Sequence, residues 1–167
     1  MFTLKPLSPS AIPAALAKAE RYRLLNEPAQ AESICEDVLR AEPGHSQALV
    51  MLILALTDRF PHHDGKVVSR AQELARQLPT DYERAYYGGL VAERRARALV
   101  DRGGPGGART AGDWLREAMQ AYEHAETMRP PGNDDTLLRW NACARMFLQH
   151  PGLRQRDEGG TAPVMLE

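Results

Sequence analysis

Apolar residues recur at intervals of three and four along most of the chain, which is the spacing of one face of an α-helix. No stretch alternates apolar and polar residues long enough to predict a strand. Proline and glycine interrupt the pattern and separate the predicted helices, at about 10–25, 26–42, 46–60, 64–78, 81–100, 110–128 and 133–149. The third is apolar nearly all round, so we expect it to be central and buried. The pattern predicts an all-α protein.

Several residues mark the ends and contacts of these helices. Thr80 and Glu83 have the spacing of a capping box, and Asn26 is expected to cap the second helix. Gly88 and Gly89 lie within the fifth helix, where each costs about 1 kcal/mol relative to alanine. We expect a neighbouring helix to pack closely against the missing side chains.

The boundaries of the helical region follow from composition. One domain is expected over residues 10–149, because 167 residues suit a single domain. Residues 1–9 are predicted to be a flexible N-terminus, and residues 150–167, which are polar and rich in glycine, a disordered tail. Within the domain, the glycine-rich residues 102–109 are predicted to form a loop.

Charge and cysteine usage limit the class of protein. The net charge is -1 and 26% of residues are charged, so no general basic surface for nucleic acid is expected. Cys35 and Cys143 lie at apolar helical positions and are interpreted as buried free thiols in a reducing compartment. The sequence shows no signal peptide, and its longest apolar run, residues 48–56, is too short to span a bilayer. We expect a cytoplasmic protein without membrane insertion.

The predicted helices recur in pairs. Tyr22 and Leu56 hold equivalent places in the first helices of two pairs and are 34 residues apart. Pro43 and Pro79 close the second helices and are 36 apart. Pro130 lies 51 residues beyond Pro79, which is one period plus an insertion of about 17. A long fifth helix and the glycine-rich loop account for the insertion.

A two-helix unit with this period resembles the tetratricopeptide repeat family. In that family the second helix carries alanine, an aromatic residue, alanine and a terminal proline at intervals of four, three and five. One set here matches in full, namely Ala118, Tyr122, Ala125 and Pro130. A second set matches at its first and last places: Ala31, Cys35, Val38 and Pro43. A third keeps the spacing but few identities: Val67, Ala71, Leu74 and Pro79.

The first helices carry part of the family pattern too. Gly89 and Tyr22 fall where the family usually has glycine and tyrosine, and the resemblance covers residues 11–148. It implies about three helix pairs in a right-handed α-solenoid, followed by a C-terminal capping helix. The pairs are expected at about 10–42, 46–78 and 81–128, and the cap at 133–149.

The resemblance also implies a function. Arrays of this kind bind an extended or helical segment of another protein in a concave groove lined by the first helices. Transferring the groove positions gives Leu16, Glu20, Arg23, Gln47, Val50, Leu54, Asp58, Glu83, Tyr86, Leu90, Arg94, Arg97, Asn141 and Arg145. This mixed surface suits a peptide with apolar anchors and an acidic residue. Because Leu16 and Glu20 replace the lysine and asparagine of the family's carboxylate clamp, that clamp is absent.

We therefore expect an adaptor, a scaffold, or an assembly or secretion chaperone, with no enzymatic activity and no cofactor. The alternative is a self-associating structural subunit, and the oligomeric state stays open. A remote alternative is a metal-dependent enzyme using His62 and His63. Adjacent histidines point apart and no distant pair completes a ligand set, so a solvated loop with Asp64 as helix cap is favoured. The basic stretch from Arg94 to Arg109 is interpreted mainly as a solvated helix face.

Overall fold

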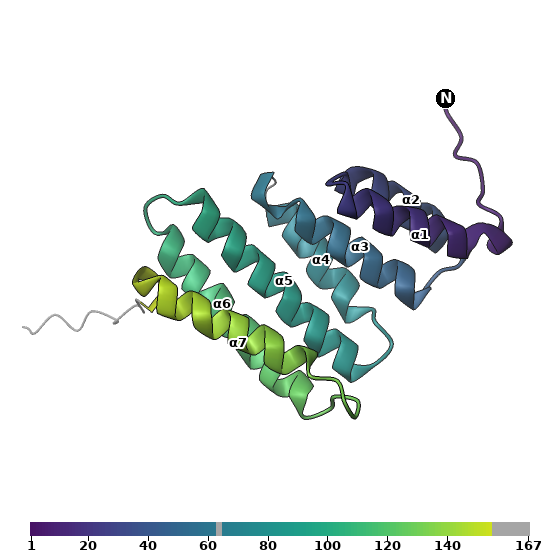
Figure 1. The fold of residues 1–167 in the computed structure, drawn as a ribbon. Helices are drawn as coiled ribbons and strands as arrows, with labels where there is room; N and C mark the ends of the chain where they lie inside the picture. The colour runs from purple at the N-terminus through teal and green to yellow at the C-terminus, as the bar shows by residue number, and fades with distance from the viewer. Residues whose placement is uncertain (63–64, 155–167) are drawn as a thin grey trace, which may run out of the picture.

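The computed structural model describes residues 1–62 and 65–154, and all regular structure within them is helical (Figure 1). The predicted all-α class is confirmed. The described residues form seven α-helices: α1 (Ile12–Leu24), α2 (Pro28–Ala41), α3 (Ser46–Asp58), α4 (Gly65–Arg76), α5 (Asp81–Arg102), α6 (Gly107–Glu126) and α7 (Asp135–Gln149). Short 3-10 turns are η1 (Pro9–Ala11), η2 (Phe60–His62) and η3 (Pro151–Arg154).

The helix ends agree with local sequence in some places and not in others. The capping box at the start of α5 is confirmed, because the Glu83 N–H donates to Thr80 Oγ1 at 3.1 Å and the Thr80 N–H to Glu83 Oε2 at 3.2 Å. The predicted cap at Asn26 is wrong. Asn26 has a φ of 59°, and Glu27 is the residue at the N-cap of α2. Asparagine tolerates this left-handed conformation, so Asn26 serves in the turn that follows α1.

Two helix boundaries also differ from prediction. The loop expected over 102–109 is shorter, since α5 runs to Arg102 and α6 begins at Gly107. Gly103, Gly104 and Gly106 all have positive φ, so the turn uses conformations that glycine adopts without strain. Helix α4 ends at Arg76, two residues before the predicted end at Leu78, although the Leu78 side chain is still buried. The cap expected at residue 64 lies outside the described residues.

The packed part of the chain continues beyond α7. Residues 151–154 form η3, which packs on α6 and buries Leu153. Gly112 allows the contact, because a Cβ there would lie 2.1 Å from the Leu153 carbonyl oxygen. Arg116 Nη2 donates to the carbonyls of Leu153 and Arg154, at 3.2 Å each. The boundary predicted at residue 149 is therefore too early, and the remainder of the predicted tail, 155–167, lies outside the described residues.

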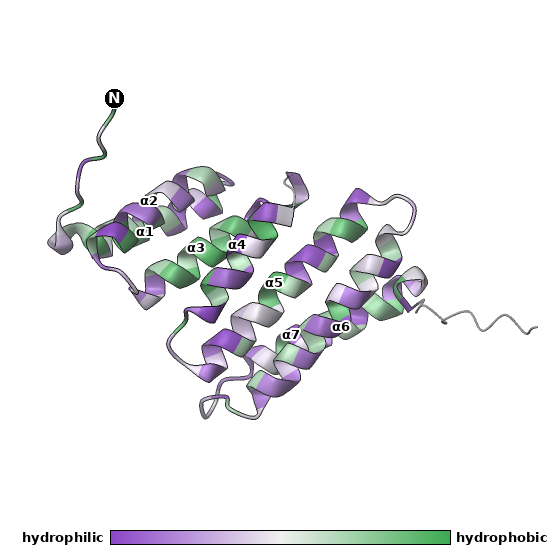
Figure 2. Cartoon of the chain, turned by 180° about the vertical axis from the view of Figure 1, so that it is seen from behind, coloured by the Kyte–Doolittle hydropathy of each residue, from purple (hydrophilic) through white to green (hydrophobic). Residues whose placement is uncertain are grey.

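The helices pack in chain order. Each helix contacts the next one, and α3 also contacts α1 and α5. One large buried cluster surrounds α3, which is apolar along most of its length (Figure 2). A second lies between α5, α6 and α7 and includes Tyr122 and Cys143. A small third cluster around Leu16 closes the N-terminal end, and Leu7 packs against it, so part of the predicted flexible N-terminus contacts the core.

Both cysteines are buried and unbonded, as the sequence predicts. Burial in apolar surroundings disfavours the thiolate and raises the pKa of Cys35 to about 12. Burial likewise raises the pKa of Cys143 to about 12. Neutral thiols of this kind act as small core residues.

The contact between α5 and α6 is the most extensive in the molecule. These two helices are the longest among the described residues. Gly89 makes the close approach possible, because a Cβ there would lie 2.9 Å from Tyr122 Cε1 and 3.2 Å from the Ala121 Cβ. The expected role of a glycine at a helix contact is confirmed at Gly89. At Gly88, by contrast, an added Cβ would have nothing within 4 Å.

The two glycines therefore make a matched pair. Gly88→Ala should raise the free energy of unfolding by about 1 kcal/mol, because alanine favours the helix. Gly89→Ala should lower it by about 1–3 kcal/mol, because the methyl group overpacks against a buried ring. Chemical denaturation followed by circular dichroism measures both, and equal shifts for the two variants would contradict the close approach at Gly89.

Candidate functional site

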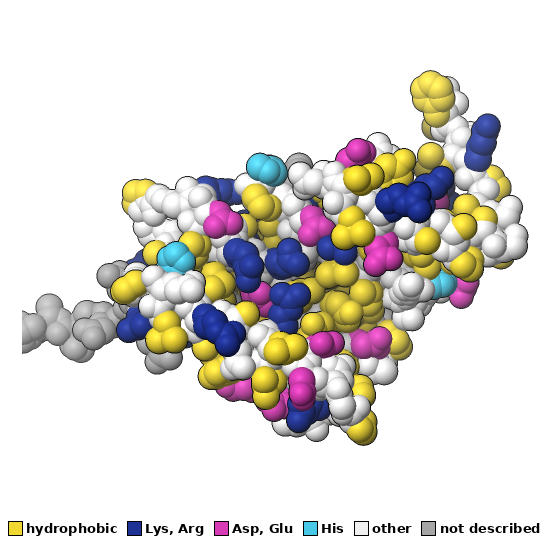
Figure 3. All heavy atoms as spheres, in the orientation of Figure 1, with side chains coloured by type: hydrophobic (Ala, Val, Ile, Leu, Met, Phe, Trp, Pro, Cys, Tyr) yellow, Lys and Arg dark blue, Asp and Glu magenta, His cyan; other side chains and the backbone are white. Residues whose placement is uncertain are grey.

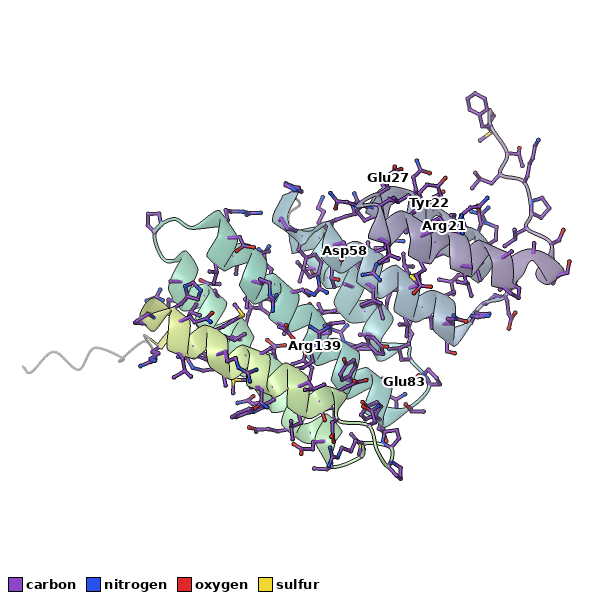
Figure 4. All side chains as sticks on the ribbon, in the orientation of Figure 1. Arg21, Tyr22, Glu27, Asp58, Glu83 and Arg139 are labelled. Carbon is purple, nitrogen blue, oxygen red and sulfur yellow. The ribbon has the colours of Figure 1, made fainter. Side chains whose placement is uncertain are left out.

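One side of the molecule is formed by the first helix of each expected pair and by α7. Figure 1 shows α1, α3, α5 and α7 on the side that faces the viewer, with α2, α4 and α6 largely behind them. We call this side the front face. In Figure 4, Asp58 on α3 and Arg139 on α7 lie on it together. The predicted groove residues come mainly from these helices.

The structure divides the predicted groove residues by burial. Leu16 and Leu90 are only 3% and 1% exposed, so both pack into the core and offer no surface to a ligand. Eight are half-buried: Arg23, Val50, Leu54, Asp58, Glu83, Tyr86, Arg94 and Asn141. Four are exposed: Glu20, Gln47, Arg97 and Arg145. Helical spacing predicts which side of a helix a residue lies on. It does not predict which residues of that side are exposed and which are buried against the neighbouring helix.

Charged side chains from three helices meet in a hollow of about 270 Å³ on this face, which we call the central pocket. Arg23 at the end of α1 holds Asp58 at the end of α3, with Nε to Oδ2 at 2.7 Å and Nη2 to Oδ1 at 3.3 Å. Arg94 Nη1 on α5 lies 3.6 Å from the same Oδ1. The full lining is Arg23, Leu24, Asn26, Thr57, Asp58, Pro61, Arg94, Arg97, Ala98 and Asp101.

Arg94 is the least satisfied of these groups. Its Nε is buried and has no hydrogen-bond partner among the described residues. Burial lowers the pKa of Arg94, and the charge of Asp58 counteracts that shift. Arginine nevertheless stays protonated in proteins, so Arg94 brings a full positive charge with unused donors. Figure 3 shows arginine and lysine side chains gathered over the middle of this face, beside a hydrophobic area.

A buried carboxylate lies behind this surface and was not predicted from sequence. Glu93 is fully buried in α5. The Tyr122 hydroxyl donates to its Oε2 at 2.7 Å, while Arg97 Nη2 and Arg139 Nη1 approach its Oε1 at 3.0 and 3.4 Å. The network joins α5, α6 and α7 and fixes one side of Arg97. Burial is the main cause of the raised pKa of Tyr122, so its hydroxyl stays protonated and donates.

Tyr86 has a structural role in addition to its predicted place in the groove. Its ring lies 5.0 Å from that of Tyr87 and 5.8 Å from that of Tyr122, measured between centroids. It also interacts with Arg139, whose pKa is lowered by burial but raised by the charge of Glu93 and then by the Tyr86 hydroxyl, with a net rise. The apolar part of the front face that can be altered with least damage is therefore Val50 and Leu54 on α3.

The basic stretch from Arg94 to Arg109 does not form a single surface. Four of the five arginines between residues 94 and 109 lie on α5 and the fifth, Arg109, lies on α6; Arg94 and Arg97 line the central pocket. Arg102 donates to the Pro61 carbonyl at 3.4 Å, and Arg95 is half-buried. Successive residues of a helix point in different directions, which separates arginines that are adjacent in the sequence.

The remaining candidate chemistry receives no support from the described residues. Within 1–62 and 65–154, no three histidine, cysteine, aspartate or glutamate side chains are grouped closely enough to hold a metal ion. His63 and Asp64 lie outside the described residues. None of the described helices combines the length and apolar character needed to cross a membrane. Comparison with protein families, with curated proteins and with solved structures gives no match for the chain.

The hydrogen bond to Glu93 can be tested without changing side-chain volume. Tyr122→Phe removes the donor of a buried carboxylate and should lower the free energy of unfolding by about 1–3 kcal/mol. Tyr82→Phe is the control, because Tyr82 accepts only a partly buried bond from Asn133 Nδ2 at 3.1 Å. It should cost less than about 1 kcal/mol. Urea denaturation compares the two variants, and equal costs would contradict a role for Tyr122 in holding Glu93.

Proposed function

We propose that the chain is a protein-interaction module of the tetratricopeptide-like kind, and that its front face binds a segment of a partner protein. The segment carries apolar side chains and at least one acidic residue. Binding does not require any chemical step, so the proposal assigns no enzymatic activity and no cofactor. The buried free thiols fit a reducing compartment, and we place the protein in the cytoplasm on that ground.

The observation that carries the proposal is the composition of the front face. Val50 and Leu54 provide a half-buried apolar strip on α3, and Arg94 and Arg97 lie beyond it on α5. An apolar strip next to unsatisfied positive charge complements a segment with apolar anchors and a carboxylate. The front face reaches solvent, because each of its four helices carries an exposed side chain there: Glu20, Gln47, Arg97 and Arg145.

The packing of the helices supports the repeat interpretation. α3 contacts α1 on one side and α5 on the other, so the first helices of successive pairs are neighbours, as in a stacked array. Val50 and Leu54 come from the middle pair and the arginines from the next. A segment crossing the face would contact more than one pair, which is how repeat proteins reach affinity with a shallow surface.

The apolar strip can be tested by selecting peptides from a random 12-mer display library on the full chain, a length of about 40 Å when extended. A double variant, Val50→Thr with Leu54→Gln, should weaken the selected peptides by about 10-fold or more, because it removes two apolar contacts. The matched control, Val67→Thr with Leu74→Gln, makes the same changes at half-buried positions of α4, behind the front face.

Circular dichroism of both variants checks that the helices persist. Equal binding by the two double variants would remove the front face as the binding surface. Failure of the unmodified chain to enrich any peptide would overturn the proposed function itself.

Self-association is a second candidate function, favoured by a different surface. Leu137, Leu138 and Leu148 on α7 are 40%, 62% and 70% exposed. Leu137 and Leu148 lie about three helical turns apart on one side of α7. Three exposed leucines on one helix give a second copy of the chain an apolar surface to cover.

If a second copy covers α7, light scattering should give twice the monomer mass, and Leu137→Gln with Leu148→Gln should return it to the monomer. A monomer at all concentrations would exclude this candidate. Leu24→Gln is the control, because Leu24 is an exposed leucine on α1, at 83%, and does not lie on α7.

A further inference from the structure

We infer that the central pocket is a subsite for one acidic side chain of the partner segment, with Arg94 as the principal donor and Asp58 as an internal competitor for it. This inference rests on the proposed function and adds which residues select the partner. The ligand group is the carboxylate of an aspartate or glutamate.

The side chains around the pocket carry a net charge of one positive unit, which one negative charge of a ligand would neutralise. With the buried Glu93 and its second partner Arg139 included, four arginines face three carboxylates: Arg23, Arg94, Arg97 and Arg139 against Asp58, Asp101 and Glu93. The excess of one positive charge matches a single carboxylate. A doubly charged phosphate would exceed it, and the two aspartates would repel it.

The hydrogen bonds show why Arg94 is the open position. Asp58 is already bound by Arg23 through two nitrogens, and its Oδ1 is the atom that Arg94 approaches at 3.6 Å. That separation is an ion pair without a hydrogen bond. The buried Nε of Arg94 has no partner either. The Arg94 side chain is 30% exposed although its Nε is buried, so a ligand carboxylate can accept hydrogen bonds from its terminal Nη groups.

Arg97 is placed to assist from the neighbouring turn. Its Nη2 donates to buried Glu93 at 3.0 Å, which holds the guanidinium in position, while its side chain is still 48% exposed. The other N–H groups of the guanidinium can therefore reach a ligand. Leu24, Pro61 and Ala98 also line the pocket and offer apolar contact to the methylene groups of an acidic side chain.

Two variants of the full chain test the subsite in opposite directions. Arg94→Gln removes the donor and should weaken an acid-containing peptide by about 10-fold or more. Asp58→Asn removes the competing carboxylate and should strengthen the same peptide. Arg76→Gln is the matched control, because Arg76 is an exposed arginine of α4 paired with Glu73.

The probes are the leading 12-mer selected on the unmodified chain and an analogue with its acidic residue changed to the amide. Isothermal titration of both peptides against the unmodified chain, Arg94→Gln and Arg76→Gln forms a double-mutant cycle. The acid peptide should lose affinity with Arg94→Gln, whereas the amide analogue should bind all three chains equally. A merely structural role of Arg94 would affect both peptides alike.

The outcomes separate the two levels of inference. If the selected peptides carry an acidic residue at no fixed distance from the apolar anchors, or if Arg94→Gln behaves like Arg76→Gln, the subsite is wrong while the proposed function stands. If inorganic phosphate displaces the peptide and the amide analogue binds as well as the acid, the pocket is a phosphate site and the inference is overturned. If no peptide is enriched at all, both the subsite and the proposed function fail.

Discussion

The close contact between α5 and α6 determines where the residues of the candidate site lie. Gly89 lets the Tyr122 ring approach the α5 backbone, and the Tyr122 hydroxyl then reaches Glu93 on the next turn. A buried carboxylate is costly unless it is paired, and here one hydroxyl and two arginines compensate it. Arg97 is consequently fixed at the edge of the central pocket. The packing of Gly89 against Tyr122 in the core therefore determines where the charge of Arg97 lies on the surface.

The features of the fold that depend on local sequence were predicted from it. Helical periodicity identified the helices, and Thr80 with Glu83 identified the start of α5. Asn26 was misassigned because asparagine suits both an N-cap and a left-handed turn, and the choice depends on how the preceding helix ends. The position of η3 was missed for another reason: Leu153 is held by a contact with distant Gly112, which no local pattern reveals.

The candidate site was predictable only in outline. Helical spacing brought Arg23, Asp58 and Arg94 to one face, and the structure brings them together. Helical spacing could not show that Asp58 is already bound by Arg23, because these two residues are 35 positions apart in the chain. Nor could it show that Leu16 and Leu90 turn inward. Glu93 had no signal beyond its place among apolar neighbours, since a glutamate in a helix is ordinarily solvated.

The η3 segment has a practical consequence for work with this protein. Leu153 covers Gly112 on α6, where the absence of a side chain leaves backbone exposed once the segment is removed. A chain truncated directly after α7 would lack Leu153 and would expose the apolar surface that Leu153 covers at the end of the molecule. Exposed apolar surface of this kind favours aggregation. Fragments intended for crystallisation or for surface immobilisation should therefore retain Arg154, whose own carbonyl is held by Arg116.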